Sequence, residues 1–205
     1  MPALPVFGKA CQSSISQNRQ DLPHHVAVII WLNGPFGVGK TTTARALLRR
    51  LPQAVLFDPE PFGAALRHTV ANVETRTDFQ DLRGWPALVI ETARILRHTY
   101  AETLIVPLTV LTTASAKALA AGLAGVDSDV LRFRLVASEA TLRARILQRP
   151  ETEGPRAWCF DHLGAGMLLM ANAAFGEAVA TDDRDPEQVA DSILGRLVIV
   201  RAGGN

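Results

Sequence analysis

Near the start of the chain, a glycine-rich segment matches the pattern G-x-x-x-x-G-K-S/T: Gly34-Pro35-Phe36-Gly37-Val38-Gly39-Lys40-Thr41. It follows a continuous β-branched and apolar run, Val26–Leu32, and precedes a stretch with apolar residues at helical spacing, Thr41–Leu51. In this strand, turn and helix order the glycines let the backbone fold tightly and turn its N–H groups inward. The positive end of the following helix also attracts anions. The segment therefore predicts a phosphate-binding loop.

Two side chains of this loop have expected roles of their own. Lys40 is predicted to reach the β- and γ-phosphates of ATP, and the Thr41 hydroxyl is predicted to bind Mg²⁺. ATP and Mg²⁺ are therefore the expected cofactors. The other predicted nucleotide contacts lie beside these two residues, at Gly34, Pro35, Phe36, Gly37, Val38, Gly39 and Thr42.

Strand and helix patterns alternate along the rest of the chain. Further strands are expected at Ala54–Phe57, Thr103–Val106, Val130–Val136 and Ala178–Ala180. Further helices are expected to open at Pro59, to span Trp85–Tyr100, to span Ser138–Leu147 with Ser138 as N-cap, and to begin at Pro186 with Asp185 as cap. This alternation implies right-handed crossovers, and it predicts a three-layer α/β/α fold with a mainly parallel sheet.

Composition restricts the class of protein further. The 205 residues favour one domain, and 48% hydrophobic against 20% charged residues exclude wholesale disorder. Lys+Arg 21 against Asp+Glu 20 leaves a net charge of +1, so no broad field attracts nucleic acid or anionic lipid. The apolar runs are shorter than the ~20 residues that span a bilayer. Cys11 and Cys159 lie far apart without a C-x-x-C motif, which argues against a disulfide framework or a zinc ribbon.

The expected organisation is an N-terminal arm followed by one domain. Residues 1–25 contain a polar stretch without a period of two or 3.6, and they lack the apolar region of a secretory signal. We interpret them as a loose arm. Residues 26–205 are expected to form a single cytoplasmic domain, with a lid near residues 149–160.

A phosphoryl-transfer site also needs a carboxylate at the carboxyl edge of the sheet. The run Val55-Leu56-Phe57-Asp58 ends in one, whereas no acid directly follows Val106. Asp58 is therefore predicted to orient or deprotonate the acceptor hydroxyl and to orient Mg²⁺. The alternative is that Asp58 is an N-cap for the helix opened by Pro59. Glu60 is a weaker candidate, for substrate contact, because the helix dipole also favours an acid there. Asp182 is a rival acid, but helix capping explains it equally well.

Arginines supply the expected positive charge. Arg145 and Arg149 lie four residues apart, so they project from one face of the Ser138–Leu147 helix, and their planar guanidinium groups match phosphate oxygens. The Pro150–Ala157 loop, which includes Arg156, is long enough to close as a lid. We predict catalytic roles for Arg149 and Arg145; a solvated helix face is the alternative. Arg67 is a candidate acceptor contact or a surface arginine.

Taken together, these segments resemble the tunicamycin-resistance protein family. The resemblance spans about Val26 to Leu197 and rests on Ile30-Trp31-Leu32-Asn33-Gly34, the loop that follows, Asp58-Pro59-Glu60, Phe62-Gly63-Ala64-Ala65-Leu66-Arg67, Asp78-Phe79-Gln80, Leu104-Ile105-Val106-Pro107 and Ala137-Ser138 with Thr141-Leu142. It implies a P-loop fold like that of nucleoside-monophosphate and small-molecule kinases, ATP binding, and protection against tunicamycin, a uridine-containing nucleoside antibiotic.

The same resemblance assigns individual residues. Lys40 and Thr41 correspond to the ATP site, Asp58 to the proposed catalytic acid and Arg149 to the lid. The founding member of the family carries a C-terminal amphipathic segment proposed to touch membranes. Here Leu197–Arg201 is too short and too uncharged for an interfacial helix, so stable membrane anchoring is not expected.

Three functional hypotheses follow. The first is ATP-dependent phosphorylation of tunicamycin or a related nucleoside-containing small molecule by a phosphotransferase. The second is ATP-dependent sequestration of the antibiotic without chemistry, and the third is a housekeeping nucleoside or nucleotide kinase. Paired acids and arginines favour chemistry, whereas the missing acid after Val106 favours sequestration.

Overall fold

A computed structural model describes residues 28–76, 78–110, 112–150 and 156–202. The expected N-terminal arm, residues 1–25, and residues 151–155 of the expected lid lie outside this part. Five strands form one parallel sheet in the order β2-β3-β1-β4-β5. Their bounds are β1 Val28–Asn33, β2 Ala54–Leu56, β3 Thr103–Pro107, β4 Val130–Val136 and β5 Glu177–Ala180.

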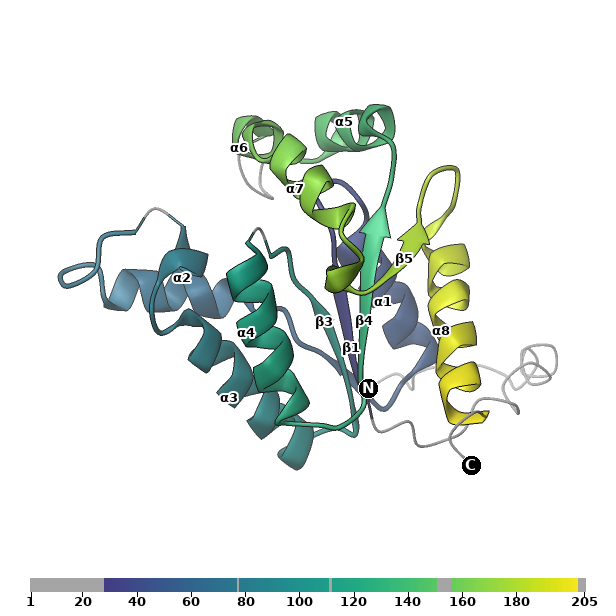
Figure 1. The fold of residues 1–205 in the computed structure, drawn as a ribbon, viewed down its shortest axis with the longest axis horizontal. Coiled ribbons are helices and arrows are strands. Elements are labelled where there is room, and N and C mark those ends of the chain that lie inside the picture. Colours follow the sequence, from purple (N-terminus) through teal and green to yellow (C-terminus); the bar gives the residue numbers. More distant parts are fainter. Residues whose placement is uncertain (1–27, 77, 111, 151–155, 203–205) are drawn as a thin grey trace, which may run out of the picture.

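Eight α-helices are described in these ranges: α1 Lys40–Arg50, α2 Glu60–Thr69, α3 Trp85–Thr99, α4 Thr113–Ala124, α5 Glu139–Gln148, α6 Arg156–Asp161, α7 Leu163–Met170 and α8 Pro186–Ala202. Short 3₁₀ turns, η1 Phe79–Asp81 and η3 Ala173–Phe175, connect some of them. Figure 1 shows α1 and α8 on one side of the sheet, α3 and α4 on the other, α5 and α6 beyond the end of β4, and α7 running down alongside β4. The expected three-layer α/β/α architecture is confirmed.

The central strand β1 explains why both faces of the sheet are covered. It pairs in parallel with β3 on one side and β4 on the other, with Ile30 opposite both Ile105 and Leu131. All six of its residues are buried. A strand with parallel neighbours on both sides and helices on both faces has no solvated side, which accounts for its unbroken apolar sequence.

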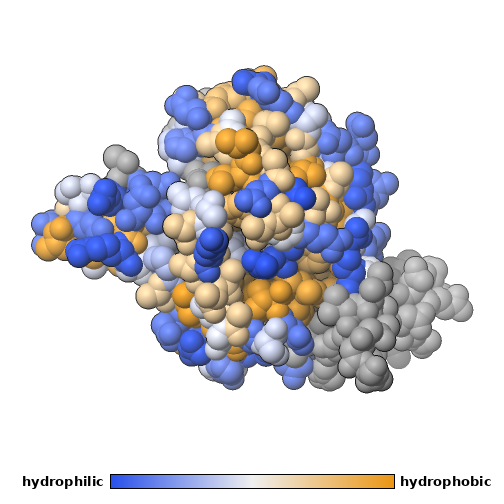
Figure 2. Space-filling model, in the orientation of Figure 1, coloured by the Kyte–Doolittle hydropathy of each residue, from blue (hydrophilic) through white to orange (hydrophobic). Residues whose placement is uncertain are grey.

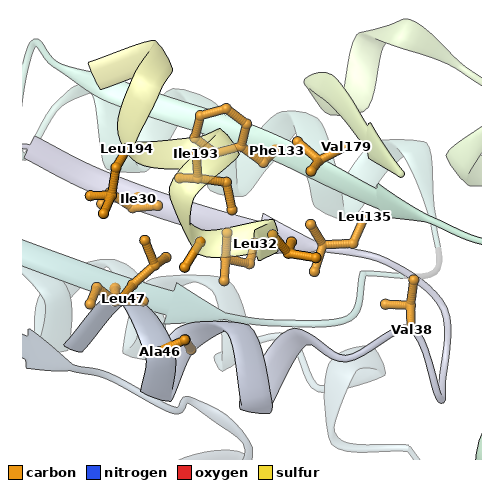
Figure 3. Packing of buried hydrophobic residues seen from close by; sticks show 14 of the residues in the cluster. Ile30, Leu32, Val38, Ala46, Leu47, Phe133, Leu135, Val179, Ile193 and Leu194 are labelled. Atoms are coloured by element: carbon orange, nitrogen blue, oxygen red, sulfur yellow. The ribbon is translucent and has the colours of Figure 1, made fainter. Parts of the chain in front are cut away.

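Alternate residues of β1 build two cores. Ile30 and Leu32 pack with residues of α1 and α8 (Figure 3). Ile29 and Trp31 pack in the second cluster, which includes residues of α3 and α4. Because successive side chains of a strand point to opposite faces, one short segment anchors both helical layers.

Most expected helices are confirmed, with their caps. The Ser138 side chain accepts a hydrogen bond from the N–H of Thr141 at the start of α5, and Asp185 Oδ1 accepts one from the N–H of Gln188 in α8. α4, α6 and α7 were not predicted. The placement of Arg156 in a loop was wrong, because Arg156 is the first residue of α6.

The region around α2 is attached largely by aromatic contacts. Figure 2 shows hydrophilic residues over most of the lobe that contains α2, at the left of the view. The rings of Phe79 and Trp85 meet edge to face with centroids 4.8 Å apart, and those of Phe57 and Phe62 at 5.6 Å. Gly63 allows this approach, since a Cβ there would lie 2.4 Å from the Phe79 ring. These contacts hold the first turn of α2, with Glu60, against the end of β2.

Candidate nucleotide-binding site

The glycine-rich segment forms a tight loop between β1 and α1. Gly37 and Gly39 have φ of 78° and 97°, a left-handed region that disfavours other residues. A Cβ at Gly37 would also lie 2.9 Å from the carbonyl oxygen of Leu142 in α5. The loop therefore needs glycine at these positions for its backbone conformation and for the close approach of α5.

Asn33, the last residue of β1, joins the loop to the segment that follows β3. Its Oδ1 accepts the N–H of Gly34 at 2.8 Å and the N–H of Val110 at 3.1 Å. The side chain is almost fully buried. One carbonyl oxygen thus fixes the first residue of the loop relative to the neighbouring strand.

A cavity of about 500 Å³ opens over this loop at the carboxyl end of the sheet. This volume is in the usual range for small-molecule sites. Its lining joins residues from distant parts of the chain: Phe36, Gly37, Val38, Gly39, Lys40, Thr41, Thr42, Thr43, Glu60, Thr109, Arg145, Gln148, Arg149, Pro150, Thr181, Arg184, Pro186 and Val189. Most of the residues predicted for the site are among them, whereas Gly34, Pro35, Asp58 and Arg67 are not.

Lys40 carries the main positive charge of the loop. Its Nζ donates hydrogen bonds to the carbonyl oxygens of Gly34 at 2.9 Å and Pro35 at 3.1 Å, and lies 5.5 Å from the centroid of the Phe36 ring. Burial lowers the pKa of Lys40 to about 8, against the attraction of the Glu60 carboxylate. The ammonium is thus poorly solvated, so an incoming phosphate would stabilise its charge.

Glu60 and Asp58 occupy different environments. Glu60 lines the cavity. Desolvation raises the pKa of its carboxyl, although the positive charge of Lys40 counteracts this shift. Both acids are exposed, and the Oδ1 of Asp58 accepts the backbone N–H of Glu60 at 3.0 Å. This is the capping contact foreseen as the alternative for Asp58. Of the two acids, Glu60 is the one that lines the cavity with Lys40.

The two predicted arginines both line the cavity but are held differently. Arg149 Nη1 donates to the Sγ of the buried Cys159 at 3.3 Å, and its positive charge contributes to the lowered pKa of Lys40. Arg145 donates to Thr181, at 3.0 Å to the hydroxyl and 2.7 Å to the carbonyl oxygen. A longer contact reaches the carbonyl oxygen of Val38 at 3.4 Å. Arg145 therefore ties α5 to the segment after β5 and to the loop.

Several lining residues were not found from the sequence. Thr109 and Thr181 follow β3 and β5, and their position just beyond strand ends was the signal that could have indicated them. Arg184, Pro186 and Val189 form the part of the wall contributed by the start of α8 and the turn before it. The rival acid Asp182 instead accepts hydrogen bonds from Ser138 and Thr141.

The residues present fit Mg²⁺ as the expected cofactor. Thr41 is exposed and lines the cavity, so its hydroxyl oxygen is available beside the phosphate-binding loop. Among the described residues, no group of three His, Cys, Asp or Glu side chains could hold a metal by itself. A hydroxyl oxygen suits Mg²⁺, a hard cation that proteins usually hold with few side chains together with substrate phosphates and water. Arg67 lies exposed in the last turn of α2.

This fold and this site together define a P-loop protein with a kinase-like architecture. Residues 29–158 match the AAA domain family, and the chain belongs to that family. The match includes the loop, both acids after β2, and Arg145 and Arg149 of the cavity wall. No helix in the described part of the chain combines the length and apolar character needed to cross a bilayer.

The chain is similar to the tunicamycin resistance protein of Deinococcus radiodurans, with 28% identity and a TM-score of 0.67, over 83% of this chain and 95% of that one. The expected resemblance is thereby confirmed. A gluconokinase from Sinorhizobium meliloti is 14% identical with a TM-score of 0.57, over 85% of this chain and 93% of that one. A shikimate kinase from Acinetobacter baumannii is 16% identical with a TM-score of 0.56, over 86% and 95%. These two show the fold alone, and no curated protein sequence matches the chain.

Proposed function

We propose that this protein is an ATP-dependent small-molecule phosphotransferase whose acceptor is tunicamycin or a related nucleoside-containing compound. The observation that carries the proposal is the pairing of Lys40 and Glu60 within one cavity of about 500 Å³ over the phosphate-binding loop. A cation that is placed for phosphate and a carboxylate in the lining of the same cavity are two groups that a phosphoryl transfer to a hydroxyl can use.

The nucleotide would lie along the length of the cavity. The loop amides and Lys40 would bind the β- and γ-phosphates, with Thr41 as the hydroxyl ligand of Mg²⁺. Asp58, which is not part of the cavity lining, would act on Mg²⁺ only through its hydration shell. The wall formed by Arg145, Pro186 and Val189 would contact the base. Bound Mg²⁺ would neutralise charge on the phosphates.

The transfer itself would use Glu60 and Arg149, which also line the cavity. An oxygen of the acceptor hydroxyl attacks the γ-phosphorus, the bond from that phosphorus to the β,γ-bridging oxygen breaks, and ADP leaves with the electron pair. The hydroxyl proton passes to the Glu60 carboxylate, whose raised pKa suits a proton acceptor. Arg149 would stabilise the charge that develops on the transferred group.

The choice of acceptor is supported by the similarity to the tunicamycin resistance protein of D. radiodurans. The near-balanced net charge of +1 does not favour nucleic acid as a partner. We place the activity in the cytoplasm, where ATP is available, without stable membrane anchoring. The third hypothesis, a housekeeping kinase whose acceptor is a nucleoside or nucleotide, would use the same side chains of the cavity.

A different kind of function is ATP-dependent sequestration of the antibiotic without chemistry. The observation in its favour is that Thr109, and not an acid, follows β3 in the cavity wall. A hydroxyl at this point cannot take up a proton or balance the charge of a metal. Binding would then be gated by ATP, and the drug would be released unchanged.

Mass spectrometry of tunicamycin after incubation with protein, ATP and Mg²⁺ distinguishes these hypotheses. The proposal expects a product heavier by one phosphoryl group, formed with release of ADP. Lys40→Ala is the matched control and should form no product. An unchanged drug that binds tightly only with ATP supports sequestration. An unchanged drug that does not bind, together with phosphorylation of a simple nucleoside, supports the metabolic kinase.

A further inference from the structure

Thr109 is a cavity-lining residue whose buried hydroxyl has no hydrogen-bond partner in the described part of the chain. Its side chain is 2% exposed, and among the described residues no atom pairs with its Oγ1. Thr109 nevertheless lines the same cavity as Lys40 and Thr41. A polar group removed from water and left unpaired destabilises the free protein, so a ligand atom that pairs with it gains the interaction at no further desolvation cost to the protein.

The fold holds this hydroxyl beside the phosphate-binding loop. Thr109 lies two residues beyond the end of β3, and hydrogen bonds on either side connect the segment to β1. The N–H of Leu108 donates to the carbonyl oxygen of Leu32 at 3.0 Å, and the N–H of Val110 donates to Asn33 Oδ1 at 3.1 Å. Asn33 Oδ1 also accepts the N–H of Gly34. The backbone on both sides of Thr109 is thus fixed relative to the first residue of the loop.

Sheet order places Thr109 between the two reacting groups of the site. β3 lies between β2 and β1, and the strands are parallel. The segments that follow them therefore emerge at one edge in the same order: Glu60 after β2, Thr109 after β3 and the loop with Lys40 after β1. This order favours Thr109 as a contact for a terminal phosphate that projects from the loop toward Glu60.

We propose that Thr109 Oγ1 donates a hydrogen bond to a γ-phosphate oxygen of bound ATP and thereby makes the site distinguish ATP from ADP. The inference rests on the proposed function, because it assumes that the loop holds the β- and γ-phosphates of ATP. A neutral donor suits this position because it can contact an anionic oxygen directly, where a carboxylate would repel it. The residue is a binding group for the terminal phosphate and takes no part in proton transfer.

Thr109→Val tests this directly, because valine keeps the branched shape and loses only the hydroxyl. Its affinities for ADP and for the non-hydrolysable β,γ-imido analogue of ATP would be measured by calorimetry with Mg²⁺. We expect an unchanged ADP affinity and a loss of about tenfold or more in affinity for the ATP analogue, the usual scale for a hydrogen bond to a charged group. The thermal midpoint of the ligand-free variant should rise, since an unpaired buried hydroxyl is removed.

Two further variants complete the test. Thr109→Ser keeps the hydroxyl and should retain most of the preference for the ATP analogue. Thr103→Val removes a buried β3 hydroxyl outside the cavity and should leave both affinities unchanged. An equal loss for both nucleotides, or no loss for either, would overturn the role of Thr109. If the unmodified protein binds neither nucleotide, the proposed function itself is wrong.

Discussion

Lys40 and Glu60 each stabilise the charged form of the other while burial acts against both. The Glu60 carboxylate raises the pKa of Lys40 and the Lys40 ammonium lowers that of Glu60, yet desolvation is the largest effect on each group. A lysine with a pKa of about 8 and a glutamate with a raised pKa therefore share one cavity. Pairs of groups whose pKa values are shifted by burial in this way are typical of reactive sites. The shifts should make nucleotide affinity and turnover depend on pH.

Nucleotide affinity should fall as pH rises above about 8. The free protein loses the Lys40 proton through a pKa of about 8, whereas the phosphate-bound form keeps it to higher pH because the anion stabilises the ammonium. Binding then requires proton uptake, so the dissociation constant for ADP should increase toward a limit of about tenfold per pH unit above that pKa. Titration calorimetry between pH 7.5 and pH 9.5 measures this slope.

Lys40→Ala supplies the control for that slope. It should weaken ADP and ATP binding strongly, keep the fold and show no dependence on pH over the same range. A constant affinity of the unmodified protein across this range would show that Lys40 does not contact the phosphates.

Glu60→Gln should abolish most of the turnover and leave ADP affinity nearly unchanged. Glutamine preserves the shape and can orient a hydroxyl, but it cannot accept a proton, and positioned proton acceptors contribute about 10²- to 10⁴-fold in rate. The rate of the unmodified protein should rise with pH through the raised pKa of Glu60, and the variant should lack this acid limb. Full activity of Glu60→Gln would transfer the proton-accepting role to Asp58.

Asp58→Asn separates capping from chemistry. Asparagine caps a helix about as well as aspartate, so the contact with the N–H of Glu60 should persist and the thermal midpoint should stay within about 2 °C of the parent. We expect reduced turnover and a higher Mg²⁺ requirement, because the charge next to the metal's hydration shell is lost. Unchanged turnover and unchanged Mg²⁺ requirement would leave Asp58 with the capping role alone.

Arg149→Ala should lower turnover by a large factor and change ADP affinity little, if the guanidinium acts on the charge that develops during transfer. Arg149→Lys should restore little, since an ammonium lacks the planar pair of donors. Single-turnover rates and ADP titrations on the three proteins give the two quantities. Parallel losses of rate and ADP affinity would place Arg149 in ground-state binding instead.

The ion pair between Arg97 of α3 and Asp127 should stabilise the fold more than the exposed pair between Glu91 and Arg94 of the same helix. Arg97 Nε donates to Asp127 Oδ2 at 2.6 Å, and the side chains are only 15% and 9% exposed. Asp127→Ala leaves a guanidinium with little solvent, and we expect it to lower the free energy of unfolding by about 3 kcal/mol. Denaturant unfolding measures the change.

The exposed pair between Glu91 and Arg94 is the matched control. Its side chains are 63% and 41% exposed, and Glu91→Ala should change the free energy of unfolding by less than about 1 kcal/mol. Equal effects of the two substitutions would mean that burial does not strengthen the Arg97 pair.

Local patterns were enough to predict the framework of the protein. The loop, β1 and α1 were recognisable because strand burial, glycine conformation and helical spacing all act within a few residues of one another. Ser138 and Asp185 were assigned as caps for the same reason, since an N-cap contacts an N–H only two or three residues away.

α4 was missed because its signal is of another kind. The segment Thr113–Ala124 is rich in alanine and has no marked apolar stripe, so periodicity does not reveal it. The strong helix propensity of alanine and the cap at Thr112, which accepts the N–H of Ser115, were the available signals.

The composition of the cavity wall depended on tertiary structure. The sequence favoured Asp58 over Glu60, and only the placement of α2 decides that Glu60 lines the cavity with Lys40 while Asp58 caps the helix. The only local sign for Thr109 is its position just beyond a strand end, and its place in the cavity wall depends on β3 lying next to β1 in the sheet. Hydrogen bonding and steric preference act between near neighbours in the chain and can be inferred from sequence, whereas the lining of a cavity depends on contacts between segments far apart in it.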